Sequence, residues 1–252
     1  MTFRDYLYID EGKLDLLAQQ IRTRKKETAK RGKKISLSIT GLGVELSEED
    51  TWRELSTHEK IEALLAHLMI SDLLDTTRPQ ERDPQEDAGI PCGRPFVLET
   101  AFARRVIIPN AHLAAAPGIK HLAVWVSDPD PSVHTREDYV WRGTFLYLTE
   151  LWLDDKTSPF WSGCSALQAI VNATHGKSLN TCDASEPFGR RNCDHPISKL
   201  LSVGAVAGDL RHITSLYAKR SMTNEQCYTW EGERRRVNDL LGYPIFIATA
   251  TQ

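Results

Sequence analysis

Apolar residues recur at strand and helix spacings from the first residues of the chain. Residues 3–9 are dense in aromatic and β-favouring side chains and predict a buried strand. Asp10 then supplies an N-cap for a helix whose apolar positions recur at spacings of three and four. These positions are Leu14, Leu17, Ala18 and Ile21. The chain therefore starts as a strand, a turn and a helix.

A second helix is indicated by the spacing of Ser56 and Glu59. A hydroxyl at the N-cap and a carboxylate three residues later form a capping box, in which each side chain satisfies a backbone donor of the first turn. One face of the following segment is apolar, with Ile61, Leu64, Leu65, Leu68 and Met69. The pattern predicts a core-packed helix that runs to about Asp75.

The segment between the two helices begins with a basic stretch and continues with alternating apolar and polar side chains. Residues 22–34 contain eight basic residues and one acid, so this stretch is expected to be a solvated loop. Residues 35–39 alternate apolar and hydroxyl side chains, which is typical of a strand with one wet face. Residues 42–46 are its expected partner strand.

Short β-favouring runs dominate the middle of the chain. They lie at residues 96–98, 105–108, 121–126 and 144–148, and turn-forming residues separate them. Before them, residues 78–93 form a polar segment with prolines, which predicts a linker or a long loop. We therefore expect an N-terminal α/β segment over residues 1–77 and a main domain over residues 94–252, with a single domain as the alternative.

The last third of the chain mixes both kinds of pattern. Helices are expected at residues 165–174, 197–203 and 231–241, the last with a basic face, and strands at residues 210–217 and 243–248. The predicted fold class is α+β, with a mixed, mainly antiparallel sheet or small barrel in the middle of the chain and flanking helices.

The composition of the chain says more about its cellular location than about its function. The chain has 252 residues, 41% of them hydrophobic and 26% charged, with a net charge of -3, so no whole-protein field draws it to nucleic acid or to a membrane. The opening residues lack the apolar run of a signal peptide. Five scattered cysteines fit free thiols in a reducing cytoplasm. We expect a cytoplasmic protein that does not cross a membrane.

Cys164 is a candidate nucleophile. If Ser162 is an N-cap, the cysteine occupies the second helical position, where the helix dipole favours a thiolate. His175 lies about 16 Å along a continuous helix from it, too far to act as its base. The remaining candidates for the base are His134, His195 and His212. The competing interpretation is that Cys164 is a buried, unreactive side chain.

A zinc site is a further hypothesis. Cys182, Cys193 and His195 supply soft ligands within a short stretch, and Cys227 or His212 would complete a tetrahedral set. Their spacing matches no common zinc-binding pattern, and the alternative is a polar loop with free cysteines.

Two basic clusters are candidates for anion binding. The first contains Arg22, Arg24, Lys25 and Lys26, and the second contains Arg234, Arg235 and Arg236. If both clusters met across the fold, they would form a face suited to phosphate groups. The first lacks the aromatic residues that stack on single-stranded nucleic acid.

The N-terminal pattern Tyr6-x-Tyr8-x-Asp10-x-x-Lys13-x-x-x-Leu17-x-x-Gln20-Ile21 resembles the opening of several uncharacterised bacterial families, some of them associated with anti-phage or conflict gene clusters. The resemblance covers about fifteen residues and implies no catalytic residues. It implies a cytoplasmic accessory or sensor protein, one that responds to a nucleotide signal, in bacterial defence.

Three hypotheses follow from the sequence, which favours a binding protein over an enzyme. The first is a binding or sensor protein that recognises an anionic small molecule or a protein partner, with nucleic acid as a further possible ligand. The second is a hydrolase or transferase that uses Cys164, with His195 or His212 as base. The third is a structural subunit that assembles, as a homo-oligomer for example, through its aromatic-rich strands.

Overall fold

A computed structural model describes the chain over residues 5–30, 55–80, 94–109, 119–130, 143–153, 193–202, 204–230 and 232–250. The strands and helices in chain order are β1 (Tyr6–Ile9), α1 (Glu11–Lys30), α3 (Thr57–Ile70), β2 (Leu74–Asp75), β3 (Phe96–Ile108), β4 (Ile119–Ser127), β5 (Thr144–Leu153), β6 (Cys193–Asp194), α6 (Pro196–Ser202), β7 (Val206–Trp230) and β8 (Glu233–Thr249). The strands expected at residues 35–39 and 42–46 and the helix expected at residues 165–174 lie outside these ranges.

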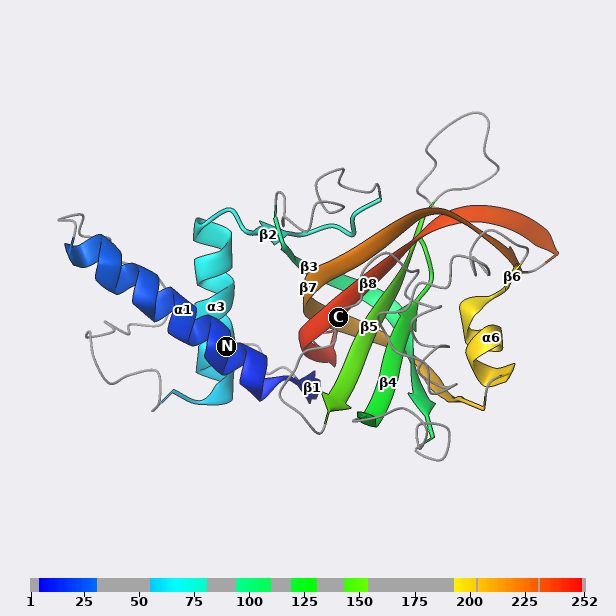
Figure 1. The fold of residues 1–252 in the computed structure, drawn as a ribbon, viewed down its shortest axis with the longest axis horizontal. Coiled ribbons are helices and arrows are strands. Elements are labelled where there is room, and N and C mark those ends of the chain that lie inside the picture. The colour runs from blue at the N-terminus through cyan, green and yellow to red at the C-terminus, as the bar shows by residue number, and fades with distance from the viewer. Residues whose placement is uncertain are drawn as a thin grey trace.

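Five strands close into a small barrel in the middle of the molecule (Figure 1). The order is β8, β5, β4, β3 and β7, and β7 pairs with β8 to complete the ring. Pairing around the ring is antiparallel except between β5 and β8. β1 adds to β8 outside the ring, and β2 and β6 pair in parallel with β3 and β7. This arrangement confirms the predicted α+β class with a mixed, mainly antiparallel sheet closed as a small barrel.

The interior of the barrel is filled by one cluster with members from all five strands. Its buried side chains are Val97, Ala103, Trp125, Leu146, Leu148, Ile213, Tyr217, Met222, Leu240 and Ile247. Gly242 makes room for the ring of Tyr217, because a Cβ atom at this position would lie 2.5 Å from Cδ2 of that residue. The missing side chain of Gly242 therefore allows the Tyr217 ring to fit between the strands.

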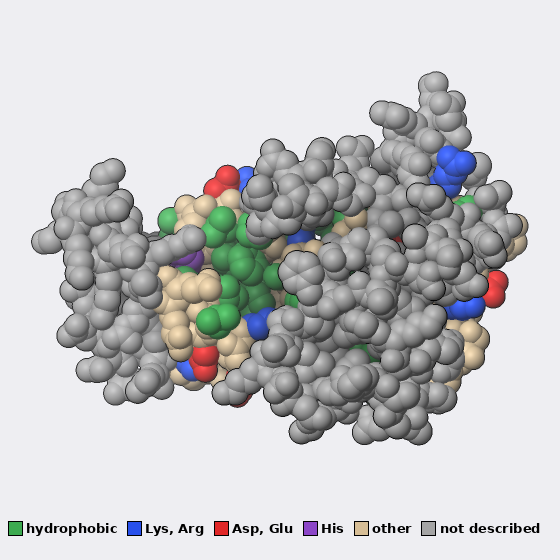
Figure 2. Space-filling view, viewed as in Figure 1, with side chains coloured by type: hydrophobic (Ala, Val, Ile, Leu, Met, Phe, Trp, Pro, Cys, Tyr) green, Lys and Arg blue, Asp and Glu red, His purple; other side chains and the backbone are tan. Residues whose placement is uncertain are grey.

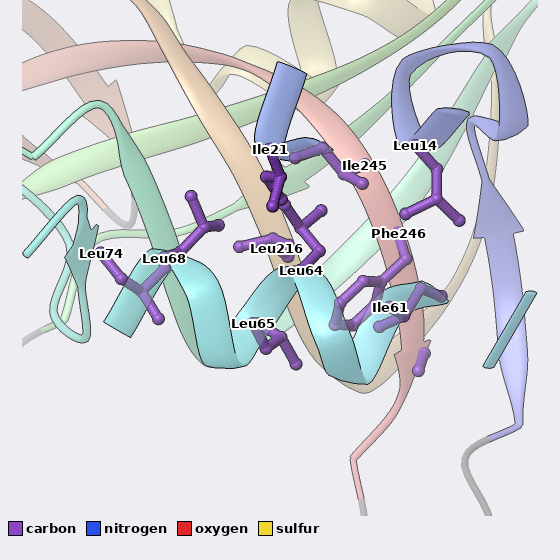
Figure 3. Packing of buried hydrophobic residues seen from close by; sticks show 11 residues of the cluster. Leu14, Ile21, Ile61, Leu64, Leu65, Leu68, Leu74, Leu216, Ile245 and Phe246 are labelled. Atoms are coloured by element: carbon purple, nitrogen blue, oxygen red, sulfur yellow. The ribbon is translucent and has the colours of Figure 1, made fainter. Parts of the chain in front are cut away.

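The two N-terminal helices cover part of the outer wall of the barrel (Figures 1 and 3). Leu216 and Phe246 neighbour the interior residues Tyr217 and Ile247 in sequence, so they point outward. They pack there with helix side chains and their neighbours in a second cluster of Leu14, Ile21, Ile61, Leu64, Leu65, Leu68, Leu74, Ile245 and Ala248. Figure 2 shows hydrophobic side chains gathered between these helices and the barrel.

Local sequence signals account for where the helices begin. The Asp10 carboxylate accepts a hydrogen bond from the backbone N–H of Lys13 at 2.9 Å, which caps α1. The predicted capping box of α3 is confirmed, since Ser56 and Glu59 exchange both bonds. The predicted end near Asp75 is wrong. α3 ends at Ile70, Asp72 has the left-handed φ of 54°, and Leu74–Asp75 pair with β3 instead.

The expectation of a solvated loop over residues 22–34 is corrected as far as the structure describes this segment. α1 continues to Lys30, nine residues beyond the buried Ile21. Arg, Lys, Glu and Ala have high helix propensity, and cations near a helix C-terminus interact favourably with the helix dipole. These local terms support a helical backbone without an apolar face.

Two further predictions about the strands are wrong. The apolar runs at residues 96–98 and 105–108 belong to one continuous strand, β3. The helix expected at residues 231–241 is instead the first half of β8, and the expected strands at 210–217 and 243–248 are parts of β7 and β8. Residues 237–241 are buried on both faces of β8, so their pattern does not alternate and imitates a helical one. The short helix expected at 197–203 is confirmed as α6.

The helices occupy opposite ends of the molecule. In Figure 1, α1 and α3 lie at one end of the barrel, whereas α6 and the distal part of the β7–β8 hairpin lie at the other. Trp230 pairs with Glu233 in this hairpin, and Gly232 has the positive φ of 76° that such a tight turn requires. Among the described helices, none is both long enough and apolar enough to cross a membrane.

We expect Leu14→Ala to lower the free energy of unfolding by about 2 to 5 kcal/mol, since it opens a cavity in the cluster between helices and barrel. Leu14 is 1% exposed, whereas Leu16 on the same helix is 54% exposed. Leu16→Ala is therefore the matched control, with an expected change of less than about 1 kcal/mol. Urea unfolding of both variants measures the difference, and equal losses would contradict the packing of α1.

Candidate functional site

A buried carboxylate lies against the outer side of the barrel wall. Asp239 on β8 accepts hydrogen bonds from the Tyr228 hydroxyl at 2.9 and 2.8 Å and from the Tyr147 hydroxyl at 3.2 Å. Tyr147 alternates with the interior residues Leu146 and Leu148, so this cluster faces away from the barrel core. The two phenol groups satisfy a carboxylate that water does not reach.

Burial raises the pKa of the Asp239 carboxyl from 3.8 to about 7, against the opposing effect of the two tyrosine hydrogen bonds. Burial also raises the pKa of the Tyr147 hydroxyl well above its usual value, and the nearby Asp239 adds to the shift. Both phenols therefore keep their protons near neutral pH and act as donors to Asp239. The cluster contains one group, Asp239, that titrates near neutrality.

His195 lies next to this cluster, but both of its ring nitrogens have partners. The ring contacts Phe145 edge-on at 5.4 Å, and Phe145 in turn contacts Tyr228 at 5.0 Å. The backbone N–H of Ile197 donates to Nδ1 at 3.2 Å, so Nε2 carries the proton that bonds to the Asp128 carboxylate at 3.1 Å. To act as a base or a zinc ligand, His195 has to give up one of these bonds.

A second buried network joins Arg78 to the barrel strands. Its Nε lies 3.2 Å from both carboxylate oxygens of Glu99, which also accepts a bond from the Tyr217 hydroxyl at 2.9 Å. The other guanidinium nitrogens donate to the carbonyl oxygens of Asp128 and Thr144 and to the hydroxyl of Ser127. Arg78 thus ties the segment after β2 to β3, β4 and β5, and Glu99 connects the network to Tyr217 on β7.

Gln80 extends this attachment to β8. The Thr144 hydroxyl donates to its side-chain carbonyl at 3.0 Å, and the Asn238 amide donates to its backbone carbonyl. Residues 78–80, at the start of the polar segment expected to be a linker, therefore bond to barrel strands; residues 81–93 lie outside the described ranges. The domain boundaries themselves stay a prediction.

A third network involves Glu150 on β5. Its carboxylate, 2% exposed, accepts bonds from the Trp125 indole at 2.5 Å and from the Arg105 guanidinium at 3.1 and 2.5 Å. The pair is charge-assisted and two-pronged, which suits a carboxylate enclosed by a barrel. As in the Arg78 network, the buried carboxylate is bonded to donors from other strands of the barrel.

One part of the barrel wall carries apolar side chains that no helix of the described residues covers. On β3 and β7, Phe102 pairs with His212 and Arg104 with Leu210. Ala103 points into the barrel, so its neighbours Phe102 and Arg104 point outward together with their partners. We call these four residues the β3–β7 face. Phe102 is 60% exposed and Leu210 is 53% exposed, and the Phe102 ring stacks on His212 at 4.6 Å. Large apolar side chains exposed on paired strands are typical of an interaction surface.

The structure separates the two histidines proposed as bases. His212 belongs to the β3–β7 face, whereas His195 follows β6, which pairs with β7 at Tyr228, sixteen residues farther along β7 than His212. Cys164 lies outside the described residues, so its role as a nucleophile stays a prediction.

The proposed zinc ligands are only partly described. Cys182 lies outside the described ranges, and Cys193 is placed only by its strand pairing to Tyr228. Cys227 is a buried free thiol. Across the described parts of the chain, no three histidine, cysteine or acidic side chains gather as metal ligands. The zinc hypothesis therefore stays a prediction.

The two basic clusters lie at opposite ends of the molecule. Arg22, Arg24, Lys25 and Lys26 belong to the second half of α1, whereas Arg234, Arg235 and Arg236 belong to the start of β8 beside the hairpin turn (Figure 1). The two clusters therefore do not meet within this chain, which was the condition for a shared anion-binding face. Each cluster has to be considered as a separate surface.

Sequence reasoning gave no role to Asp239, Glu99 or the β3–β7 face. Asp239 stands beside the apolar Leu240 and Leu241, and Glu99 directly follows the apolar run at residues 96–98. A carboxylate next to apolar residues is the signal that a partner is required inside the fold. The exposure of Phe102 and Leu210 had no such signal, because it depends on which strand faces remain uncovered.

No family model, curated protein or solved structure matches this chain. The expectations that rest on the N-terminal resemblance, including a role in bacterial defence and a cytoplasmic location, stay predictions.

We expect the stability of the protein to fall as the pH rises from about 4 to about 7. Because the folded pKa of Asp239 is raised from 3.8 to about 7, only the folded state holds its proton in this window, so the advantage it gives is lost as the pH approaches 7. Asp239→Asn should flatten this part of the profile, whatever its overall cost in stability. Urea unfolding between about pH 3 and about pH 8, a range that extends about one unit beyond that window on each side, measures the slope.

The control for this pH profile is Asp209→Asn, since Asp209 is an exposed aspartate on the neighbouring strand β7. It should leave the slope unchanged. A slope that persists in Asp239→Asn would show that another group is responsible.

We expect Glu99→Gln to lower the free energy of unfolding by about 3 to 5 kcal/mol, since the change leaves the guanidinium of Arg78 buried without its counter-charge. The side chains of this pair are 8% and 9% exposed. Asp15→Asn is the matched control, because its partner Lys60 lies near the surface and such pairs contribute about 0 to 1 kcal/mol. Similar losses in the two variants, measured by urea unfolding, would contradict a central role for the Arg78 network.

Proposed function

We propose that this protein is a binding protein that docks a partner protein on its β3–β7 face. The observation that carries the proposal is the exposure of Phe102 and Leu210 on the outward face of two paired strands. An outward sheet face that meets water usually carries polar side chains, and large apolar ones in a row are kept where a partner covers them.

The composition of the β3–β7 face narrows the chemistry of the partner. Arg104 stands across from Leu210, and no described residue forms an ion pair or a hydrogen bond with its guanidinium. Aromatic residues and arginine are the types that contribute most to the free energy of protein binding. The face therefore fits a protein surface that presents aliphatic side chains next to a carboxylate.

The side chains of the β3–β7 face do not suit a small anionic molecule. Such a ligand needs several donors that converge on one point. Here the Arg104 guanidinium is placed beside the exposed apolar side chains of Phe102 and Leu210.

The polar clusters around Asp239, Arg78 and Glu150 are better explained as parts of the fold than as catalytic groups. Their donors and acceptors already bond to one another inside the fold. A catalytic role for Cys164 stays an alternative prediction, for which thiol labelling near pH 6 is the test, because a cysteine of lowered pKa reacts there while buried ones do not.

Site-specific photo-cross-linking tests the docking surface. We expect a photoreactive phenylalanine analogue at position 102 or position 210 to give the same hetero-adduct in cells that contain the protein's natural neighbours. The reverse charge in Arg104→Glu should reduce the yield of this adduct by about tenfold, equivalent to about 1.4 kcal/mol. Gel shift and mass spectrometry of the adduct provide the measurement.

The control position is Met69 on α3, which is exposed to a similar degree, 66%. An adduct that forms equally well from position 69, or that is unaffected by Arg104→Glu, would show that the β3–β7 face is not the docking surface. An adduct with a second copy of this chain would mean that the face mediates self-assembly instead.

A further inference from the structure

The first residues of β7 pair with another described strand on one edge only. β3 pairs with β7 from Val206 to Ala218, whereas the pairing of β8 with β7 begins at Ile213. The Ala250 backbone N–H donates to the carbonyl oxygen of His212 at 3.0 Å, and no described residue bonds to this edge nearer the start of β7. Within the described part of the chain, residues 206–211 therefore form an open strand edge, which we call the open edge of β7.

Backbone hydrogen bonds show how β3 is oriented between its neighbours. The Lys219 N–H donates to the carbonyl oxygen of Pro95 at 2.9 Å, whereas the Phe96 N–H donates to the carbonyl oxygen of Leu73 at 3.2 Å, before β2. Backbone groups of successive residues in a strand point to opposite edges. The odd-numbered residues of β3 therefore bond to β7, and the even-numbered ones direct their backbone groups to the other edge.

Residues of β7 that lie opposite the even-numbered residues of β3 also turn their backbone groups away from that pairing. In an antiparallel ladder, two residues directly opposite are either both bonded to each other or both turned away. The β7 residues concerned are His212 opposite Phe102, Leu210 opposite Arg104 and, beyond a bulge, Ala207 opposite Val106. The bond from Ala250 to the carbonyl oxygen of His212 agrees with this orientation. Leu210 and Ala207 therefore each direct an N–H and a C=O to the open edge.

Side-chain exposure along the open edge of β7 agrees with this geometry. Val206 is 60% exposed and Leu210 is 53% exposed, and Gly208, Asp209 and Arg211 are exposed as well. Strand edges that are protected against pairing usually carry lysine or proline or lie under another element. Here two large apolar side chains stand on the edge, which makes it a template for a further strand.

The charges beside the open edge narrow the chemistry of its occupant. Among the described residues, the guanidinium groups of Arg104 and Arg211 have no ion-pair or hydrogen-bond partner. Arg211 lies opposite Ala103, which points into the barrel, so the two arginines leave the sheet on opposite faces. The edge itself contains one acid, Asp209, so the two arginines give the region a net positive charge. An acidic segment complements it.

We propose that the partner protein docks by adding an extended acidic segment to the open edge of β7. This inference rests on the proposed function and adds the mode of binding to it. Main-chain hydrogen bonds to Leu210 and Ala207 hold the segment as a further strand, and its alternate side chains give specificity. An aliphatic side chain of the segment lies beside Leu210, and carboxylates on its two faces meet Arg104 and Arg211.

A second copy of this chain fits the open edge less well than a segment of another protein. In a two-fold antiparallel pairing centred on Leu210, position 206 of one copy would lie opposite position 214 of the other. Thr214 is already paired with Ala248 on that edge. The second copy would therefore compete with β8.

Residue-resolved amide hydrogen exchange, measured by NMR, tests the proposal on the free chain and on the adduct captured from position 102. In the free chain, we expect the amide of Leu210 to exchange at least about tenfold faster than that of Arg211, whose N–H is directed at β3. In the adduct, exchange at Leu210 and Ala207 should slow by at least about tenfold, while exchange at Arg211 changes little.

The outcomes of this exchange experiment separate strand addition from docking. Protection of the Leu210 amide in the free chain would overturn the proposal, since the edge would then be covered within the chain. An adduct from position 102 with unchanged exchange at Leu210 would overturn strand addition and leave docking on the β3–β7 face standing. A missing adduct would contradict the proposed function itself.

Leu210→Pro provides a second test. Proline removes the N–H directed at the open edge, and this N–H takes no part in the pairing with β3, so we expect the barrel to fold. Leu210→Ala is the matched control, since it shortens the same side chain but keeps the N–H. The yield of the position-102 adduct should be about fivefold lower in Leu210→Pro than in Leu210→Ala, as the loss of one hydrogen bond requires.

Equal yields from the two folded variants would overturn strand addition, and circular dichroism verifies that they fold. Should Leu210→Pro not fold, amide exchange in the unaltered chain and its adduct decides the question.

The acidic character of the segment is tested by charge reversal. Arg211→Glu should lower the yield of the position-102 adduct by about tenfold, because like charges repel. Asp209→Asn, which removes an acid from the same edge, should raise the yield rather than lower it. An unchanged yield in Arg211→Glu would overturn an acidic occupant.

Discussion

β7 is hydrogen-bonded on both of its edges, and the rest of the fold depends on that double pairing. Residues 206–218 of β7 pair with β3, and residues 213–230 pair with β8, so the segment from Ile213 to Ala218 bonds to both neighbours. This segment closes the five-stranded ring and leaves no free edge within it. The same strand then extends past the ring and carries the hairpin against which β6 and α6 lie.

The small ring has buried carboxylates in or against its wall, and each of them has specific partners. Glu99 and Glu150 are both ion-paired to arginines, and Asp239 accepts bonds from two tyrosines. Each of these carboxylates bonds to residues of other strands or segments, so a slip of one residue in strand register would turn it away from its partners. We infer that the networks help to fix the register of the barrel at some cost in stability, which the raised pKa of Asp239 reflects.

The buried polar groups bond to partners within the fold, so the exposed surfaces are the candidates for binding. The outer wall of the barrel is covered by α1 and α3 at Leu216 and Phe246, but the β3–β7 face retains exposed apolar side chains. The second half of α1 differs in composition, since residues 22–30 contain five basic residues and one acid.

Sequence by itself determined the local features of this protein. The capping of α1 by Asp10, the capping box of Ser56 and Glu59, and the α+β class follow from interactions within a few residues, which the sequence displays directly. The same holds for the buried face of α3, except that Met69, expected on that face, is 66% exposed. Tertiary structure alone decided the rest. The strand conformation of residues 233–241, the union of two apolar runs in β3, the pairing of Arg78 with Glu99 and the exposure of Phe102 all depend on partners far away in the chain. The physical reason is that strand pairing and burial are set by contacts between distant segments, whereas helix capping and periodicity are set by neighbours.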